Sequence, residues 1–383
     1  MIQTKTDALY KKVLESYENL KNVKSLDERL AVANYIGNLY CSMVTMGDIS
    51  HSFDKYDCFG GKKKYRRAIQ KLDVYSNQLM DNYILQKEFH KNFLGEILPD
   101  IEDEMMWIIP LSFQTEETFS KNDFFDVLFQ FLKSIRLESL FDQFYKGNHI
   151  YSTLVGQSEL NLGSTIYDPI SRESDIFITD FQYDFKTLNT LVHELGHGYD
   201  LNRFLAGLGE YNQYFYNSFY GETISRLFER LFFRYLIQNN IRKDTAKDKL
   251  IDFEDLNHSF LLDSYILSLF DDEFLLEDQY LNCDKDEIIS KIKDYFIKDA
   301  PLEEFVSELQ NLDLQETYTY AYGDIISMFL VEEVEKSGFT GELFEYFLSQ
   351  RSALFSDQFM RECGFGPANY LKKYKKEVEL IKK

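Results

Sequence analysis

The five residues His193-Glu194-Leu195-Gly196-His197 combine residue types and a spacing that could do chemistry together. On a helix, residues four apart project from one face about one turn apart, so both imidazoles can reach a single Zn²⁺. Glu194 is then placed to take a proton from a metal-bound water. The pattern predicts a zinc site with Glu194 as catalytic base, and the alternative is two exposed histidines on an ordinary helix.

A catalytic zinc needs a third protein ligand and an open position for water. Downstream of the two histidines, helical spacing of apolar residues predicts a second, buried helix. The residues that form this apolar stripe are Ile224, Leu227, Phe228, Leu231, Phe232 and Tyr235. Glu222 and Glu229, seven residues apart, share another face of this helix. We expect Glu222 to be the third ligand, and Glu229 either to accept a hydrogen bond from a ligating imidazole or to pair with Arg226 or Arg230.

Hydrophobic periodicity indicates which elements must position these residues. It predicts helices over residues 6–23, 26–48, 64–95 and 122–146. Between about 150 and 183 the helical period lapses, and two short strands are expected at Leu160–Tyr167 and Asp175–Phe181. The second strand leads into the helix that carries both histidines, with Asp184 or Thr187 as its N-cap. From there helices are expected nearly to the end of the sequence.

Composition narrows the classes of protein. The 383 residues carry a formal net charge of −22, which argues against nucleic acid and anionic membrane surfaces as partners. The four cysteines form no CxxC pair, and no uncharged apolar run of 18 residues occurs, so neither a disulfide framework nor a membrane span is expected. These features predict a soluble, cytoplasmic protein.

Three motifs occur in the same order as in a known family. The HExGH motif is followed 29 residues later by Glu222, which opens an E-x-x-S-x-x-x-E pattern, and Tyr318 to Gly323 forms a tyrosine-rich stretch. In these motifs the sequence resembles the zinc oligopeptidases typified by oligoendopeptidase F and thimet oligopeptidase, over about residues 150 to 375. It departs from the family at Asp200, where a third histidine is frequent, and it lacks the histidine that precedes the family's tyrosines.

The resemblance implies a mostly α, zincin-like metallopeptidase fold with a small β-sheet before the HExxH helix. It divides the chain into an N-terminal helical region, 1–149, and a zinc metallopeptidase catalytic region, 150–383. It also implies one Zn²⁺ per chain, held by His193, His197 and Glu222, and tyrosine hydroxyls that stabilise the reacting carbonyl. On a helix Tyr318 and Tyr322 lie on one face while Tyr320 points elsewhere, so the first two are the predicted donors.

We therefore expect a metallopeptidase that cleaves oligopeptides, with Glu194 activating the attacking water. The segment Asp175–Phe181 is expected to be an edge strand along which an extended peptide pairs. Two alternatives remain open: a zinc carboxypeptidase of the related HExGH family, and a non-catalytic binding protein with a relic zinc site. The intact Glu194 counts against the relic, because a relic has no need of a base. The oligomeric state is not predicted.

Overall fold

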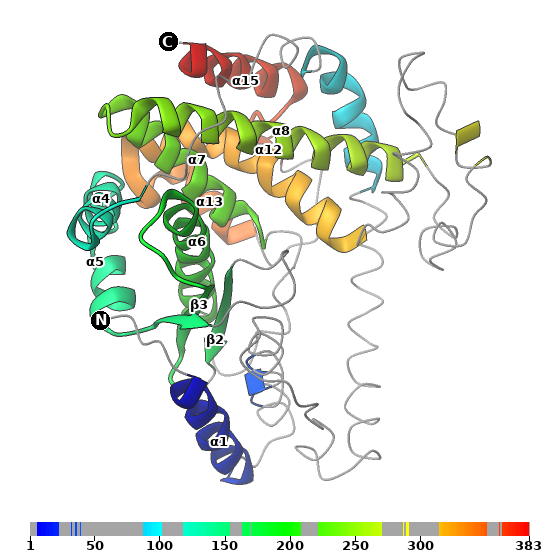
Figure 1. Cartoon of the computed structure of the whole chain (residues 1–383). Coiled ribbons are helices and arrows are strands. Elements are labelled where there is room, and N and C mark those ends of the chain that lie inside the picture. Colours follow the sequence, from blue (N-terminus) through cyan, green and yellow to red (C-terminus); the bar gives the residue numbers. More distant parts are fainter. Residues whose placement is uncertain are drawn as a thin grey trace, which may run out of the picture.

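The computed structural model describes a chain made mostly of helices, with one small sheet (Figure 1). The described residues are 6–22, 32, 35–36, 39, 87–101, 118–153, 163–168, 170–207, 221–269, 286, 289–290, 314–350, 360 and 362–382. The predicted helix over 6–23 is observed as α1 (Thr6–Asn22). Residues 87–101 are helical, whereas most of the predicted helices over 26–48 and 64–95 lie outside the described residues. The predicted fold class is confirmed: a mostly helical chain with a small sheet before the HExxH helix.

The helix α7 (Thr223–Gln238) lies at the centre of the helical part. Four helices pack on it: α4 (Lys121–Ser134), α6 (Phe185–Gly207), α8 (Lys243–Leu267) and α12 (Leu314–Ser337). The helix α12 also contacts α13 (Glu342–Gln350) and α15 (Pro367–Lys382). Nearly all residues of α7 are buried, so its charged side chains must find partners inside the protein.

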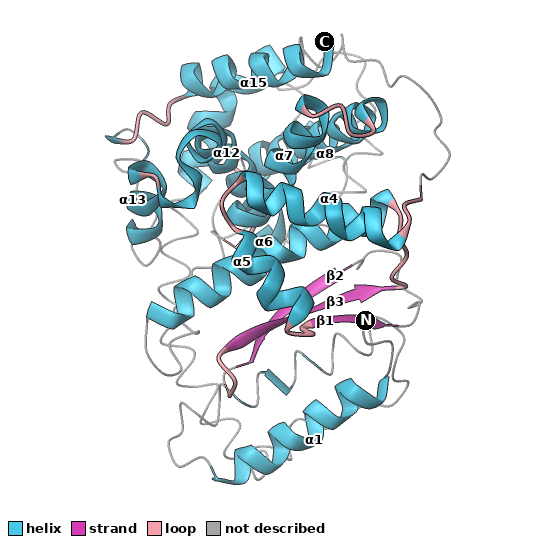
Figure 2. Cartoon of the chain, turned by 90° about the vertical axis from the view of Figure 1, so that its left-hand side faces the viewer, coloured by secondary structure: helices cyan, strands magenta, loops and turns pink. Residues whose placement is uncertain are grey.

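The sheet has three strands in the order β1-β3-β2. Their bounds are β1 (Ile150–Thr153), β2 (Gly163–Asp168) and β3 (Glu173–Thr179). β3 pairs parallel with β1 and antiparallel with β2. The helix α6 packs on β2 and β3, and α1 lies on the opposite side of the sheet (Figure 2). Because both faces are covered, the side chains in the middle of β3 are buried on both.

Two strand predictions need correction. The strands begin and end at different residues from those expected, and β3 is the central strand of the described sheet and not an edge. The reason is β1, a strand of four residues that pairs with β3 and was too short to give an alternating pattern. Among the described residues the outer strands are β1 and β2, so a peptide could not pair along β3 without displacing one of them.

The predicted helix over 122–146 is interrupted. It is observed as α4, the short α5 (Glu138–Phe141) and the π-helix η2 (Asp142–Lys146). Between α4 and α5, Arg136 has a positive φ of 61°, which ends the right-handed helix there. The boundary at residue 149 stays a prediction. No helix within the described ranges is both long and apolar enough to cross a membrane.

Candidate metal centre

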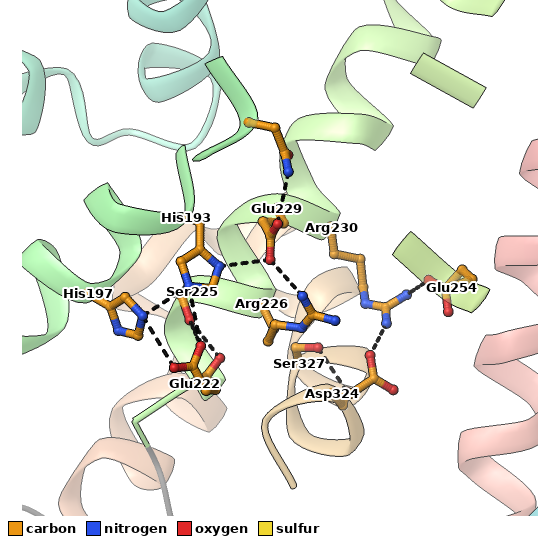
Figure 3. Close-up of polar contacts among 11 residues, drawn as sticks. His193, His197, Glu222, Ser225, Arg226, Glu229, Arg230, Glu254, Asp324 and Ser327 are labelled. Carbon is orange, nitrogen blue, oxygen red and sulfur yellow. Dashed lines mark hydrogen bonds and ion pairs between the residues drawn. The ribbon is translucent and has the colours of Figure 1, made fainter. Parts of the chain in front are cut away.

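The helix α6 begins where the sequence predicted. The Asp184 carboxylate accepts a hydrogen bond from the Thr187 backbone N–H (2.7 Å), which is the geometry of an N-cap. From this start, helical spacing buries one stripe of apolar side chains, formed by Leu188, Leu191, Val192 and Leu195. His193 and His197 project from another face, toward the start of α7 (Figure 3).

His193, His197 and Glu222 meet at one point. The two Nε2 atoms are 3.0 Å apart, and each lies 3.4 Å from one oxygen of the Glu222 carboxylate. Tetrahedral Zn²⁺, with bonds of about 2.0 to 2.1 Å, holds its ligand atoms about 3.3 to 3.4 Å apart. These three side chains are the group in the described part of the chain whose donor atoms could hold a metal ion. Two imidazoles and a carboxylate fit zinc and leave a fourth position open.

Two glycines let the helices approach closely enough to form this triad. A Cβ on Gly196 would lie 2.5 Å from Cα of Ser225, so α6 and α7 touch backbone to backbone. A Cβ on Gly323 of α12 would lie 2.9 Å from the carbonyl carbon of Glu222. Both distances are shorter than any real Cβ contact, so a larger residue would force the helices apart. The glycine of the HExGH pattern therefore has a packing role.

Glu222 is held by the first turn of α7. It is the N-cap residue of that helix, and the Ser225 hydroxyl donates a hydrogen bond to its Oε2 (2.8 Å). This bond explains the serine three residues after the glutamate, because a hydroxyl at that spacing reaches back to the carboxylate. The carboxylate is thereby oriented toward the two imidazoles.

Glu229 combines the two roles that the sequence left open. Its Oε2 accepts from His193 Nδ1 (2.9 Å) and also from Arg226 Nη1 (3.0 Å), while its Oε1 accepts from the Asn189 amide (3.0 Å). Arg230 pairs instead with Glu254 and Asp324, away from the triad (Figure 3). Asn189 was missed, although its place four residues before His193, on the same helix face, was a usable signal.

Glu194 points toward the sheet and is 5% exposed. The Thr165 hydroxyl of β2 donates a hydrogen bond to its Oε2 (2.6 Å). A Cβ on Gly163 would lie 2.8 Å from the Glu194 side chain, so β2 packs directly against it. Sequence reasoning did not identify Thr165. The nearest signal was a glycine within a strand, which marks a close approach.

Several carboxylates surround the two imidazoles, and this arrangement favours positive charge at the triad. Burial opposes ionisation of Glu222, but the His197 and His193 imidazoles outweigh it and lower the pKa of Glu222 to about 2. Burial likewise disfavours protonated His197, yet Glu222, Glu194 and Asp200 raise the pKa of His197 to about 9. The pKa of His193 is also raised, because Glu229 and Glu222 outweigh its burial. A metal ion would replace these protons.

The predicted tyrosines lie on α12, beside Gly323. Tyr318 and Tyr322 are fully buried, with the Tyr318 ring 4.8 Å from that of His90 and the Tyr322 ring 6.0 Å from that of Phe89. Tyr320 points elsewhere, as expected, and stacks on Phe260 at 4.6 Å. The contribution of the Tyr318 and Tyr322 hydroxyls to a reaction stays a prediction.

Comparisons with known proteins gave matches among solved structures alone. No family model and no curated protein matches the sequence. One similar structure is described as "putative peptidase from Chlamydophila abortus", at 12% identity and a TM-score of 0.42, over 97% of this chain and 62% of that one. Another is described as "a putative oligoendopeptidase F from Bacillus anthracis str. Ames", at 10% identity and a TM-score of 0.41, over 79% of this chain and 56% of that one. This chain thus spans less than two thirds of either.

Proposed function

We propose that the protein is a zinc-dependent metallopeptidase that hydrolyses peptide bonds in oligopeptides. The observation that carries the proposal is the convergence of His193, His197 and Glu222, with donor atoms all within 4.8 Å of one another, beside the buried Glu194. When bound there, zinc would act as a Lewis acid and lower the pKa of a water in its open position to about 7. The three-motif resemblance supports peptides as the substrate.

Glu194 is the group that would move protons. Its carboxylate accepts a hydrogen bond from the Thr165 hydroxyl, which fixes the orientation of the carboxylate. Glu194 would take a proton from the water as that water attacks the scissile carbonyl, and would later pass the proton to the leaving amine. Burial keeps this carboxylate away from bulk water that would compete for the proton.

Tyr318 and Tyr322 are the proposed donors to the carbonyl oxygen on which negative charge develops. A neutral hydroxyl aimed at that oxygen stabilises the transition state more than the ground state. Their support is the match of the Tyr318 to Gly323 stretch to the family pattern and the contact of Gly323 with Glu222. Tyr320 is not proposed, because it lies on another face of the helix from Tyr318 and Tyr322, where its ring stacks on Phe260.

The experiment that tests the proposal is hydrolysis of an internally quenched oligopeptide by the intact chain. Activity should be abolished by a chelator and restored by stoichiometric Zn²⁺. Masses of the products then distinguish internal cleavage, expected for an oligopeptidase, from release of single C-terminal residues, expected for a carboxypeptidase. A chain that binds zinc and cleaves no peptide of a varied library would instead support a binding protein.

A further inference from the structure

Arg226 is a buried, charged residue of α7 that lies close to the triad and has no role in the proposed reaction. Arg226 is 3% exposed and stands one turn before Arg230 on the same helix. Burial of a guanidinium costs free energy of folding unless the group is paired with an anion, so the partner of Arg226 indicates its role. That partner is the carboxylate oxygen of Glu229 to which His193 also donates.

Three donors fix the Glu229 carboxylate. Oε2 receives His193 Nδ1 at 2.9 Å and Arg226 Nη1 at 3.0 Å, and Oε1 receives the Asn189 amide at 3.0 Å. With donors on both oxygens, the plane of the carboxylate cannot rotate without breaking a bond. The imidazole that donates to Oε2 is therefore also fixed about its own ring axis, with Nε2 directed at His197 and Glu222.

Aromatic rings of two other helices also contact the Arg226 guanidinium. Its Cζ lies 4.2 Å from the ring centroid of Phe253 on α8 and 5.5 Å from that of Tyr320 on α12. Cation–π contacts of this kind are strongest where water is excluded, as it is here. Arg226 Nε and Nη2 have no hydrogen-bond partner within the described residues. The ion pair of Arg226 is therefore with Glu229.

We propose that Arg226 is a positioning residue of the metal centre: it holds Glu229 in the orientation that fixes the His193 ring toward the metal position. The inference rests on the proposed zinc site and adds a residue that the motif pattern does not contain. An exposed Arg and Glu three apart on a helix would stabilise the helix only slightly. In this buried setting the same pair connects α8 and α12 to a zinc ligand.

A double-mutant cycle on zinc affinity tests the proposal independently of turnover. Zinc affinity of the metal-free parent, Arg226→Met, Glu229→Gln and the double variant is measured by competition with a chelator of known affinity. Loss of a direct hydrogen-bond partner of a ligating imidazole typically costs about 10- to 100-fold in metal affinity. Arg226→Met acts through such a partner, Glu229, so we expect a loss at the lower end of this range, about 10-fold. In the Glu229→Gln background the further loss from Arg226→Met should be less than about threefold, because the group through which Arg226 acts has already been changed.

Two further variants separate positioning from general stability. Arg226→Lys keeps a cationic donor and should recover part of the affinity lost in Arg226→Met. Arg234→Met makes the same change two turns further along α7, where the partners are Glu335 and Glu377 and none touches the triad. It should lower the unfolding temperature and leave zinc affinity unchanged.

Equal losses of affinity from Arg226→Met in both backgrounds, or no loss in either, would overturn the positioning role. A parent chain that binds no zinc would instead overturn the proposed function on which the inference rests. Circular dichroism of each metal-free variant confirms that the folded state is being compared. If Arg226→Met does not fold, the cycle is run with Arg226→Lys, for which loss in the parent background alone is the expected result.

Discussion

At the scale of single residues, the proposed zinc site depends on Glu222 as its third ligand. Glu222 lies 3.4 Å from both imidazole Nε2 atoms and is held by Ser225, so Glu222→Ala would remove the proposed third ligand. We expect zinc affinity to fall by more than the roughly 10- to 100-fold typical of an outer partner. Metal analysis after dialysis against a weak chelator measures this. Retention of zinc as tight as in the parent would show that another residue is the third ligand.

The tyrosines on α12 give a second prediction at this scale. If Tyr318 and Tyr322 donate to the reacting carbonyl, their replacement by Phe should each cost about 10²- to 10³-fold in turnover, with little change in zinc binding. Tyr320→Phe is the matched control on the same helix, since that ring stacks on Phe260. Loss of turnover in the Tyr320 variant alone, or in none of the three, would assign Tyr318 and Tyr322 a packing role.

At the scale of elements, the site exists because α6 and α7 are in backbone contact at Gly196 and Ser225. In Gly196→Ala the new Cβ would meet Ser225 Cα at 2.5 Å, so the helices must separate. We expect a loss of stability of about 1 to 3 kcal/mol, as for overpacked cores, and weaker zinc binding because Glu222 moves away from the histidines. Thermal unfolding and zinc competition measure the two effects.

The matched control is Gly366→Ala, because nothing lies within 4 Å of a Cβ at that position. This variant should unfold near the parent temperature and bind zinc normally. A Gly196→Ala chain that behaved like the Gly366 variant would contradict the close approach of α6 and α7.

The elements also show what sequence could and could not predict. The α6 helix, its Asp184 cap and the pairing of its histidines with Glu222 follow from local helical periodicity and from one recognisable spacing. The order of the strands does not follow from local periodicity, because it depends on pairing between segments that are distant in the sequence. In addition, β1 is only four residues long. Thr165 was missed for the same reason, because it lies on β2 and contacts Glu194 across the packing of the sheet on α6.

At the scale of the whole molecule, a buried ionic cluster joins four helices: α7, α8, α12 and α15. Arg230 of α7 is fully buried and pairs with Glu254 of α8 and Asp324 of α12, and Asp324 also accepts from the Tyr370 hydroxyl of α15 (2.8 Å). Asp324 follows Gly323, the glycine packed on Glu222. The cluster therefore helps to set how α12 packs against the end of α7 that carries Glu222.

Removing Arg230 should destabilise the whole fold. Arg230→Met leaves the buried carboxylates of Glu254 and Asp324 without their cation, which typically costs about 3 to 5 kcal/mol. Chemical denaturation monitored by circular dichroism gives this change in the free energy of unfolding. Lys249→Met, which breaks the exposed pair with Asp252, should alter the unfolding midpoint little. Similar midpoints for both variants would contradict a stabilising role for the cluster.

The most direct test of the central claim is the Glu194→Gln variant. Glutamine keeps the shape of the side chain but cannot accept a proton, so only the proposed base function is removed. We predict one Zn²⁺ per chain, an unfolding temperature near that of the parent, and a loss of peptide turnover of at least about 10²-fold. Turnover close to that of the zinc-loaded parent would contradict the assignment of Glu194 as the base and the proposed hydrolytic centre with it.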